Sequence, residues 1–73
     1  MSFYEHAIAD SLRDQGLPTH APRLIEAWMR VEHGTLDALT RDRFDEEVRI
    51  GAECVARDPE SSERLAWSYG LFE

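Results

Sequence analysis

The sequence predicts a small all-α domain: a bundle of three main helices plus a short turn and a fourth, C-terminal helix. Apolar residues recur at spacings of three and four, as on helices that bury one face. No stretch alternates apolar and polar residues as a half-buried strand would. Glycine and proline fall where helix ends are needed. Because 73 residues suffice for one small core, we expect residues 1–73 to form a single domain.

The first helix is expected from Phe3 to Gln15. Ser2 followed three residues later by Glu5 is typical of a capping box. Gly16 suits the left-handed position after a helix, where Leu17 can fold back onto the last turn. The expected buried stripe is Tyr4, Ala7, Ile8, Ser11 and Leu12.

The second helix, from Ala21 to His33, holds the densest apolar run and is expected to be the central helix of the bundle. Thr19 is its expected N-cap, and Gly34 ends it. One line of this helix is predicted to carry Leu24, Ile25, Trp28 and Glu32, with Met29 and Val31 on the flanks.

Residues 35–39 are expected to form a single turn whose leucines tuck against the core. The third helix should start after Thr40 and run to about Arg57. Gly51 in its middle costs about 1 kcal/mol relative to alanine, which indicates close approach of another helix under Trp28. Its expected inner stripe is Phe44, Val48, Gly51, Ala52 and Val55. The expected outer ion pairs are Arg43–Glu47, Asp45–Arg49, Arg49–Glu53 and Glu53–Arg57.

The fourth helix opens with Asp58-Pro59-Glu60, which reads as an N-cap, a first-turn proline and a first-turn acid. Gly70 is expected to end it, with an apolar hook after it. Its inner residues are predicted to be Ser62, Leu65, Ala66 and Tyr69, and the hook is Leu71 and Phe72.

Composition excludes several kinds of chemistry. The single cysteine, Cys54, rules out an internal disulfide and a cysteine-rich zinc site. Lysine is absent, which removes Schiff-base and P-loop mechanisms. No apolar run is long enough for a membrane span, and the N-terminus lacks the pattern of a signal peptide, so a cytoplasmic protein is expected. The net charge of −7 argues against direct binding to nucleic acid or anionic membrane and favours a basic protein partner.

Catalytic and metal-binding patterns are absent from the sequence. His20 and His33 lie at opposite ends of one helix, about 20 Å apart, so they cannot share a metal. Glu32 is the unusual residue, an acid on an apolar line near a helix C-terminus. We expect it to accept backbone N–H groups or to pair with an arginine; an enzyme that used Glu32 and His33 is the least favoured alternative. No enzyme activity, metal or cofactor is therefore expected.

Partner binding is the function that the sequence favours. Acids cluster early in the third and fourth helices, either as a mimic of nucleic-acid phosphates or as a solvated face. Trp67 is expected on an outer face, where tryptophan suits an interface. The predicted contact set is Asp42, Asp45, Glu46, Arg49, Glu53 and Trp67. The alternative is a homodimer whose apolar interface comprises Ile50, Cys54 and Trp67.

Residues 28–48, WMRVEHGTLDALTRDRFDEEV, resemble short acidic uncharacterised proteins carried on bacterial phages and mobile elements. Many such proteins inhibit host defence or regulatory proteins by occupying their nucleic-acid or partner surfaces. The resemblance implies an inhibitor or regulator of a nucleic-acid-handling host protein.

Overall fold

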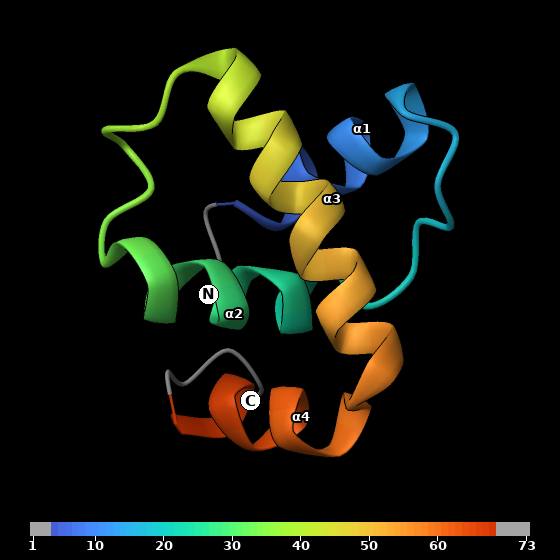
Figure 1. Cartoon of the computed structure of the whole chain (residues 1–73), viewed down its shortest axis with the longest axis vertical. Helices are drawn as coiled ribbons and strands as arrows, with labels where there is room; N and C mark the ends of the chain where they lie inside the picture. The colour runs from blue at the N-terminus through green and yellow to red at the C-terminus, as the bar shows by residue number, and fades with distance from the viewer. Residues whose placement is uncertain (1–3, 69–73) are drawn as a thin grey trace.

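The computed structural model describes residues 4–68, which form four α-helices and no strand. The helices are α1 (Glu5–Asp14), α2 (Pro22–His33), α3 (Arg41–Arg57) and α4 (Pro59–Ser68). In Figure 1, α3 crosses the molecule in front of α1, and α4 lies alongside α2. Helix α2 packs against each of the other three helices. The predicted all-α fold and the central place of the second helix are therefore confirmed.

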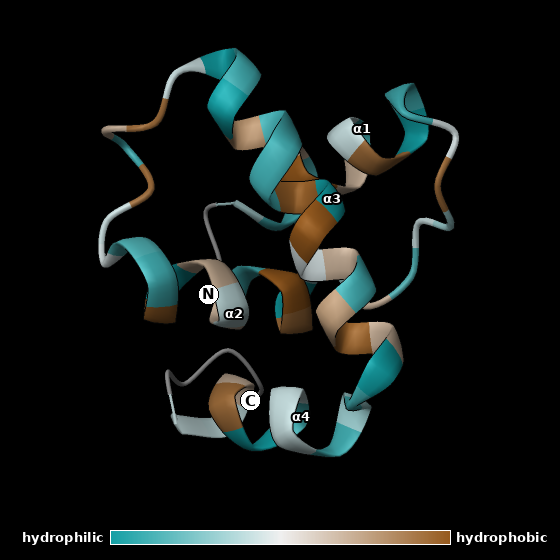
Figure 2. Cartoon of the chain, in the orientation of Figure 1, coloured by the Kyte–Doolittle hydropathy of each residue, from teal (hydrophilic) through white to brown (hydrophobic). Residues whose placement is uncertain are grey.

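Two groups of buried side chains hold the helices together. The larger group lies where α1, α2 and α3 meet, and Figure 2 shows hydrophobic stretches of α3 in its middle, where it passes the other two. A smaller group joins α2 to α4 through Ala27 and Ala66. The larger group comprises Ile8, Leu12, Ile25, Met29, Leu36, Val48 and Val55.

The end of α1 has the predicted capping geometry. Gly16 adopts a left-handed φ of 72°. The Leu17 N–H donates to the Leu12 carbonyl at 2.8 Å, and the Gly16 N–H donates to the Arg13 carbonyl at 3.0 Å. These two bonds are those of a Schellman motif. The start differs from the prediction, since α1 begins at Glu5 after Tyr4, and the expected capping serine lies outside the described residues.

The start of α2 corrects the prediction that Thr19 is its cap. The N-cap is Ala21, which has a left-handed backbone (φ 63°, ψ 38°) and no side-chain cap. Proline at 22 accounts for the missing side-chain cap and for the end of the helical backbone before it, but not for the left-handed φ of Ala21. It disfavours the αR conformation at the preceding residue, and it has no N–H that would need a cap.

The buried face of α2 also differs from the predicted line. Ile25 lies on it as expected, but Val31 is 51% exposed and Glu32 is exposed. Met29, expected on a flank, is fully buried. Because α2 is covered by α1 and α3 on one side and by α4 on another, its buried arc is broad. The buried residues of α2 are Ile25, Glu26, Ala27 and Met29.

The connection into α3 follows the prediction. Leu36 is buried and Leu39 packs against the core from a single turn, which closes with a hydrogen bond from the Leu39 N–H to the Leu36 carbonyl at 3.3 Å. Thr40 caps α3, because its hydroxyl accepts the Arg43 N–H at 3.2 Å.

Helix α4 begins at the predicted cap. The Asp58 carboxylate accepts the Ser61 N–H at 3.2 Å, and the Ser62 hydroxyl donates to the Asp58 carbonyl at 3.1 Å. Ser62 and Ala66 form its buried side. The remaining residues predicted for this helix and its hook, Tyr69, Gly70, Leu71 and Phe72, lie outside the described residues.

Candidate functional site: an apolar groove between α2 and α3

A groove opens between the start of α2, the connection that leads into it, and the second half of α3. Its volume is about 610 Å³, and apolar side chains make up most of its lining. This size is within the range of about 300–1,000 Å³ that binding sites commonly occupy. The lining comprises Leu17, Pro18, His20, Ala21, Leu24, Ile25, Arg49, Ala52, Glu53, Val55, Ala56 and Pro59.

Local structure keeps this groove open. The chain reverses after the Schellman motif at Gly16, so that residues 17–21 form one wall. On the α3 side, Ala52 and Ala56 lie one helical turn apart and line the opposite wall. Alanine is too short to fill the space between the walls, which leaves the surface concave. Ala56 is also exposed to solvent.

The polar edge of the groove lies on α3. The Arg49 guanidinium is 3.2 Å from a Glu53 carboxylate oxygen, and the two side chains are 46% and 65% exposed. This is one of the predicted i,i+4 pairs. An exposed pair of this kind contributes only about 0.3–0.5 kcal/mol to stability, so both groups can turn toward a ligand at little cost.

The residues predicted to contact a partner are only partly brought together. Asp42, Glu46, Arg49 and Glu53 follow one another along an outer stripe of α3, at a spacing of three to four residues. Arg49 and Glu53 line the groove. Trp67 is 60% exposed but belongs to α4, and α2 separates that helix from the first half of α3 (Figure 1).

Asp45, the remaining member of the predicted set, connects α3 to α1. Its carboxylate accepts the Ser11 hydroxyl at 2.7 Å, and its backbone carbonyl accepts the Gln15 side-chain amide at 2.9 Å. Arg41 lies 3.6 Å from the same side chain. The ion pair predicted between Asp45 and Arg49 is thus replaced by Asp45–Arg41 and Arg49–Glu53.

Most arginines are already paired with acids of the same chain. Within residues 4–68, the arginines that lie within 4 Å of a carboxylate are Arg13, Arg23, Arg30, Arg41, Arg43 and Arg49. By contrast, several acids are exposed and take part in none of the ion pairs among these residues: Glu32, Asp42, Glu46, Glu60 and Glu63. The surface charge available to a partner is therefore negative.

Two buried acids were not predicted. Glu26 is fully buried, and Arg30 lies 2.8 Å from its carboxylate. Glu47, expected on an outer face, is buried between Arg43 at 3.5 Å and the His33 Nε2 at 3.1 Å. The His33 contact lacks the alignment of a hydrogen bond. For either acid, the only signal in the sequence was an arginine four residues away. Exposed ion pairs have the same spacing, so this signal does not indicate burial.

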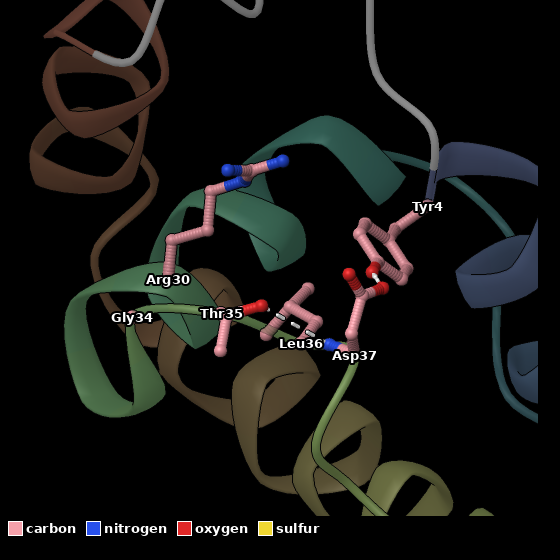
Figure 3. Close-up of a pocket in the computed structure, with 6 residues that line it drawn as sticks. All are labelled: Tyr4, Arg30, Gly34, Thr35, Leu36 and Asp37. Carbon is pink, nitrogen blue, oxygen red and sulfur yellow. Dashed lines mark hydrogen bonds between the residues drawn. The ribbon is translucent and has the colours of Figure 1, made fainter.

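A second cavity, of about 670 Å³, lies beyond the end of α2. In Figure 3, the Tyr4 hydroxyl points at the Asp37 carboxylate, to which it donates a hydrogen bond, and Arg30 lies on the other side. The Arg30 guanidinium is held by Glu26, and Asp37 is engaged by Tyr4. The charged groups of this cavity thus already have partners within the chain. Its lining residues are Tyr4, Arg30, Gly34, Thr35, Leu36 and Asp37.

Within the described part of the chain, no group of three or more histidine, cysteine, aspartate or glutamate residues is placed to hold a metal ion. Glu32 is exposed, whereas His33 faces Glu47, so the two residues of the enzyme alternative have different surroundings. Among residues 4–68, no helix combines the length and apolar character that a membrane span requires.

Comparison of the chain with protein-family models, curated proteins and solved structures finds no match.

Proposed function

We propose that this protein is a non-enzymatic interaction module whose groove between α2 and α3 holds a basic amphipathic helix of a partner protein. The observation that carries the proposal is the apolar lining of the groove. A helix with an apolar stripe is the common occupant of such a surface, because its side chains at i, i+3, i+4 and i+7 fill a hydrophobic trough. Burying this lining would supply the favourable free energy of binding.

Charge supports a basic partner. The chain carries a net charge of −7, and the pairing of most arginines leaves acids such as Asp42 and Glu46 on the surface of α3 beyond the groove. A negative surface steers a positive partner during encounter and disfavours acidic competitors. The resemblance to phage and mobile-element proteins supports a partner among nucleic-acid-handling host proteins, whose binding surfaces are basic.

Selection from a displayed library of helical peptides tests the proposal. Ala56→Glu introduces a charge into the groove at an exposed helical position, so the fold should be unaffected. Ala38→Glu makes the same change at an exposed site outside the groove and is the matched control. We expect wild type and the control to enrich basic sequences with an apolar stripe, and Ala56→Glu to lose these clones.

Two outcomes would contradict the proposal. One is clones that bind the Ala56→Glu variant as well as wild type. The other is enriched sequences without an apolar stripe. Binding of the enriched peptides should also weaken as salt rises, because exposed charges are screened over about 10 Å at 0.1 M salt.

A homodimer remains a second candidate, favoured by the 60% exposure of Trp67. The other residues of the expected interface, Ile50 and Cys54, are half-buried and offer less surface. Light scattering over a range of protein concentrations tests this candidate. A constant monomer mass, or a dimer that Trp67→Ala leaves intact, would remove it.

A further inference from the structure

We infer that the left-handed backbone of Ala21 positions one wall of the groove, so that the partner helix binds only while Ala21 keeps this conformation. The inference rests on the proposed function and names a residue that controls the same site. It follows from the connection between α1 and α2, which forms an arc in Figure 1. The observations are the strain at Ala21, the few bonds that hold the wall, and the place of the wall in the groove lining.

Ala21 has an unfavourable backbone conformation. Among residues 4–68, it is the one non-glycine residue with a positive φ, at 63°. This region is disfavoured for L-residues because Cβ approaches the following carbonyl oxygen, and the proline at 22 favours an extended backbone at the residue before it. Helix capping does not explain the conformation, since Ala21 makes no side-chain cap. Strained residues persist where the surrounding structure holds them, and they cluster at binding sites.

The wall is held at its two ends. At one end, the Leu17 N–H donates to the Leu12 carbonyl at 2.8 Å. At the other end, the Ala21 carbonyl accepts the Leu24 N–H at 3.1 Å. Residues 18–20 are exposed and make no backbone hydrogen bond within the part of the chain that the structure describes. The direction in which these residues extend from α2 is therefore set by the φ and ψ of Ala21.

This wall is part of the proposed binding surface. Most of its residues line the groove, opposite α3: Leu17, Pro18, His20 and Ala21. A change of Ala21 to the extended conformation reverses the sign of its φ, which swings residues 18–20 relative to α2 and breaks up the wall. The apparent affinity for a partner helix then falls in proportion to the fraction of molecules that keep the left-handed backbone.

Asparagine and valine at position 21 separate backbone preference from side-chain size. The two side chains have similar volumes, but asparagine is enriched in the left-handed conformation, whereas a β-branched residue there is an outlier. We expect Ala21→Asn to bind about tenfold more tightly than Ala21→Val, the ratio that the steric cost of a left-handed residue gives. Ala21→Gly has no such cost and should also bind more tightly than Ala21→Val.

The same two substitutions at Ala56 are the matched control. Ala56 lines the groove from the regular backbone of α3, so a preference for the left-handed conformation brings no advantage there. Valine is the more apolar side chain, and Ala56→Val should bind at least as tightly as Ala56→Asn. The expected order of affinities is therefore opposite at the two positions.

The probe is a synthetic peptide of about four helical turns, with leucines at i, i+3, i+4 and i+7 and lysines on its other face. It is titrated into ¹⁵N-labelled wild type and variants, and binding is followed by NMR at the amides of groove residues. A strong intraresidue NOE between the amide and α protons of residue 21 reports the left-handed backbone in wild type and in Ala21→Asn. In Ala21→Val, we expect this NOE to weaken and the changes in amide shifts to be confined to the wall and the first turn of α2.

The outcomes distinguish this inference from the proposed function. If the peptide does not shift the groove amides of wild type, the proposed function is overturned. If the peptide binds wild type there but binds Ala21→Val as tightly as Ala21→Asn, the groove is retained as the site and the role of Ala21 is overturned. An Ala21→Val protein that loses its helical structure would also refute this role, because the left-handed residue would then be needed by the whole fold rather than by the groove wall.

Discussion

Gly51 of α3 lies directly against the indole ring of Trp28 on α2. A methyl group on Gly51 would come within 3.0 Å of the Trp28 Cε3 and 3.1 Å of the Ile25 Cγ2. Both distances are at or below the limit for packed carbon atoms, so glycine is needed here for space. Ile25 also lines the groove, and this close approach of α2 to α3 therefore sets the position of one groove wall.

Gly51→Ala should destabilise the protein by about 1 kcal/mol. Alanine improves helix propensity by about 1 kcal/mol, but overpacking a core typically costs about 1–3 kcal/mol. Urea denaturation of Gly51→Ala, Trp28→Leu and the double variant measures the effect. We expect the double variant to be more stable than the sum of the single changes predicts, because the smaller side chain at 28 makes room for the methyl. A more stable Gly51→Ala protein would refute the steric argument.

Asp45 and Glu46 are neighbours with different expected roles. Asp45→Ala removes the acceptor of the buried Ser11 hydroxyl and should lower the free energy of unfolding by about 1–2 kcal/mol. Glu46 is exposed, and Glu46→Ala should stay within about 0.5 kcal/mol of wild type. Chemical denaturation of both variants checks this difference. Equal stabilities would show that the hydrogen bond from Ser11 of α1 to Asp45 of α3 contributes little to stability.

Arg30→Met should destabilise the protein by about 3 kcal/mol, because it removes a charged partner from the fully buried carboxylate of Glu26. Replacing both residues by methionine should recover most of this loss, since it removes the buried charge as well. The exposed Arg49–Glu53 pair is the control, and Arg49→Met should cost no more than about 0.5 kcal/mol. Thermal unfolding of these variants makes the comparison. A double variant no more stable than Arg30→Met would show that the buried charge is not the cause.

Features governed by local sequence were predictable. The end of α1 at Gly16, the caps at Thr40 and Asp58, and the need for glycine at 51 each depend on a few neighbouring residues or on one steric requirement. The cap at Ala21 was missed because a left-handed alanine has no distinctive sequence pattern.

Features set by the packing of distant segments were not predictable. The burial of Glu26 was not predicted, because it depends on where the other helices lie around α2. The groove combines the 17–21 connection with two helices, so only Arg49 and Glu53 of the predicted contact set line it. Their place on an outer stripe of α3 was visible in the sequence, but the hollow beside them was not.

Asp58 gives stability a defined dependence on pH. Hydrogen bonds from the Ser61 side chain and then from the Ser61 backbone hold the pKa of the Asp58 carboxyl below its ordinary value of 3.8. Because this pKa is lowered, the ionised carboxylate stabilises the folded state at pH values above 3.8. This stabilisation is lost as the pH falls through the lowered pKa of the folded state.

Asp58→Asn keeps a residue that caps helices well but removes the charge. We expect its melting temperature to be below that of wild type at about pH 7, and the difference to shrink toward about pH 2 as the wild-type carboxyl takes up a proton in the folded state. Glu63→Gln, an exposed change on the same helix, serves as the control and should show a smaller difference. Melting curves of Asp58→Asn and wild type that differ equally at both pH values would show that Asp58 acts through its shape rather than its charge.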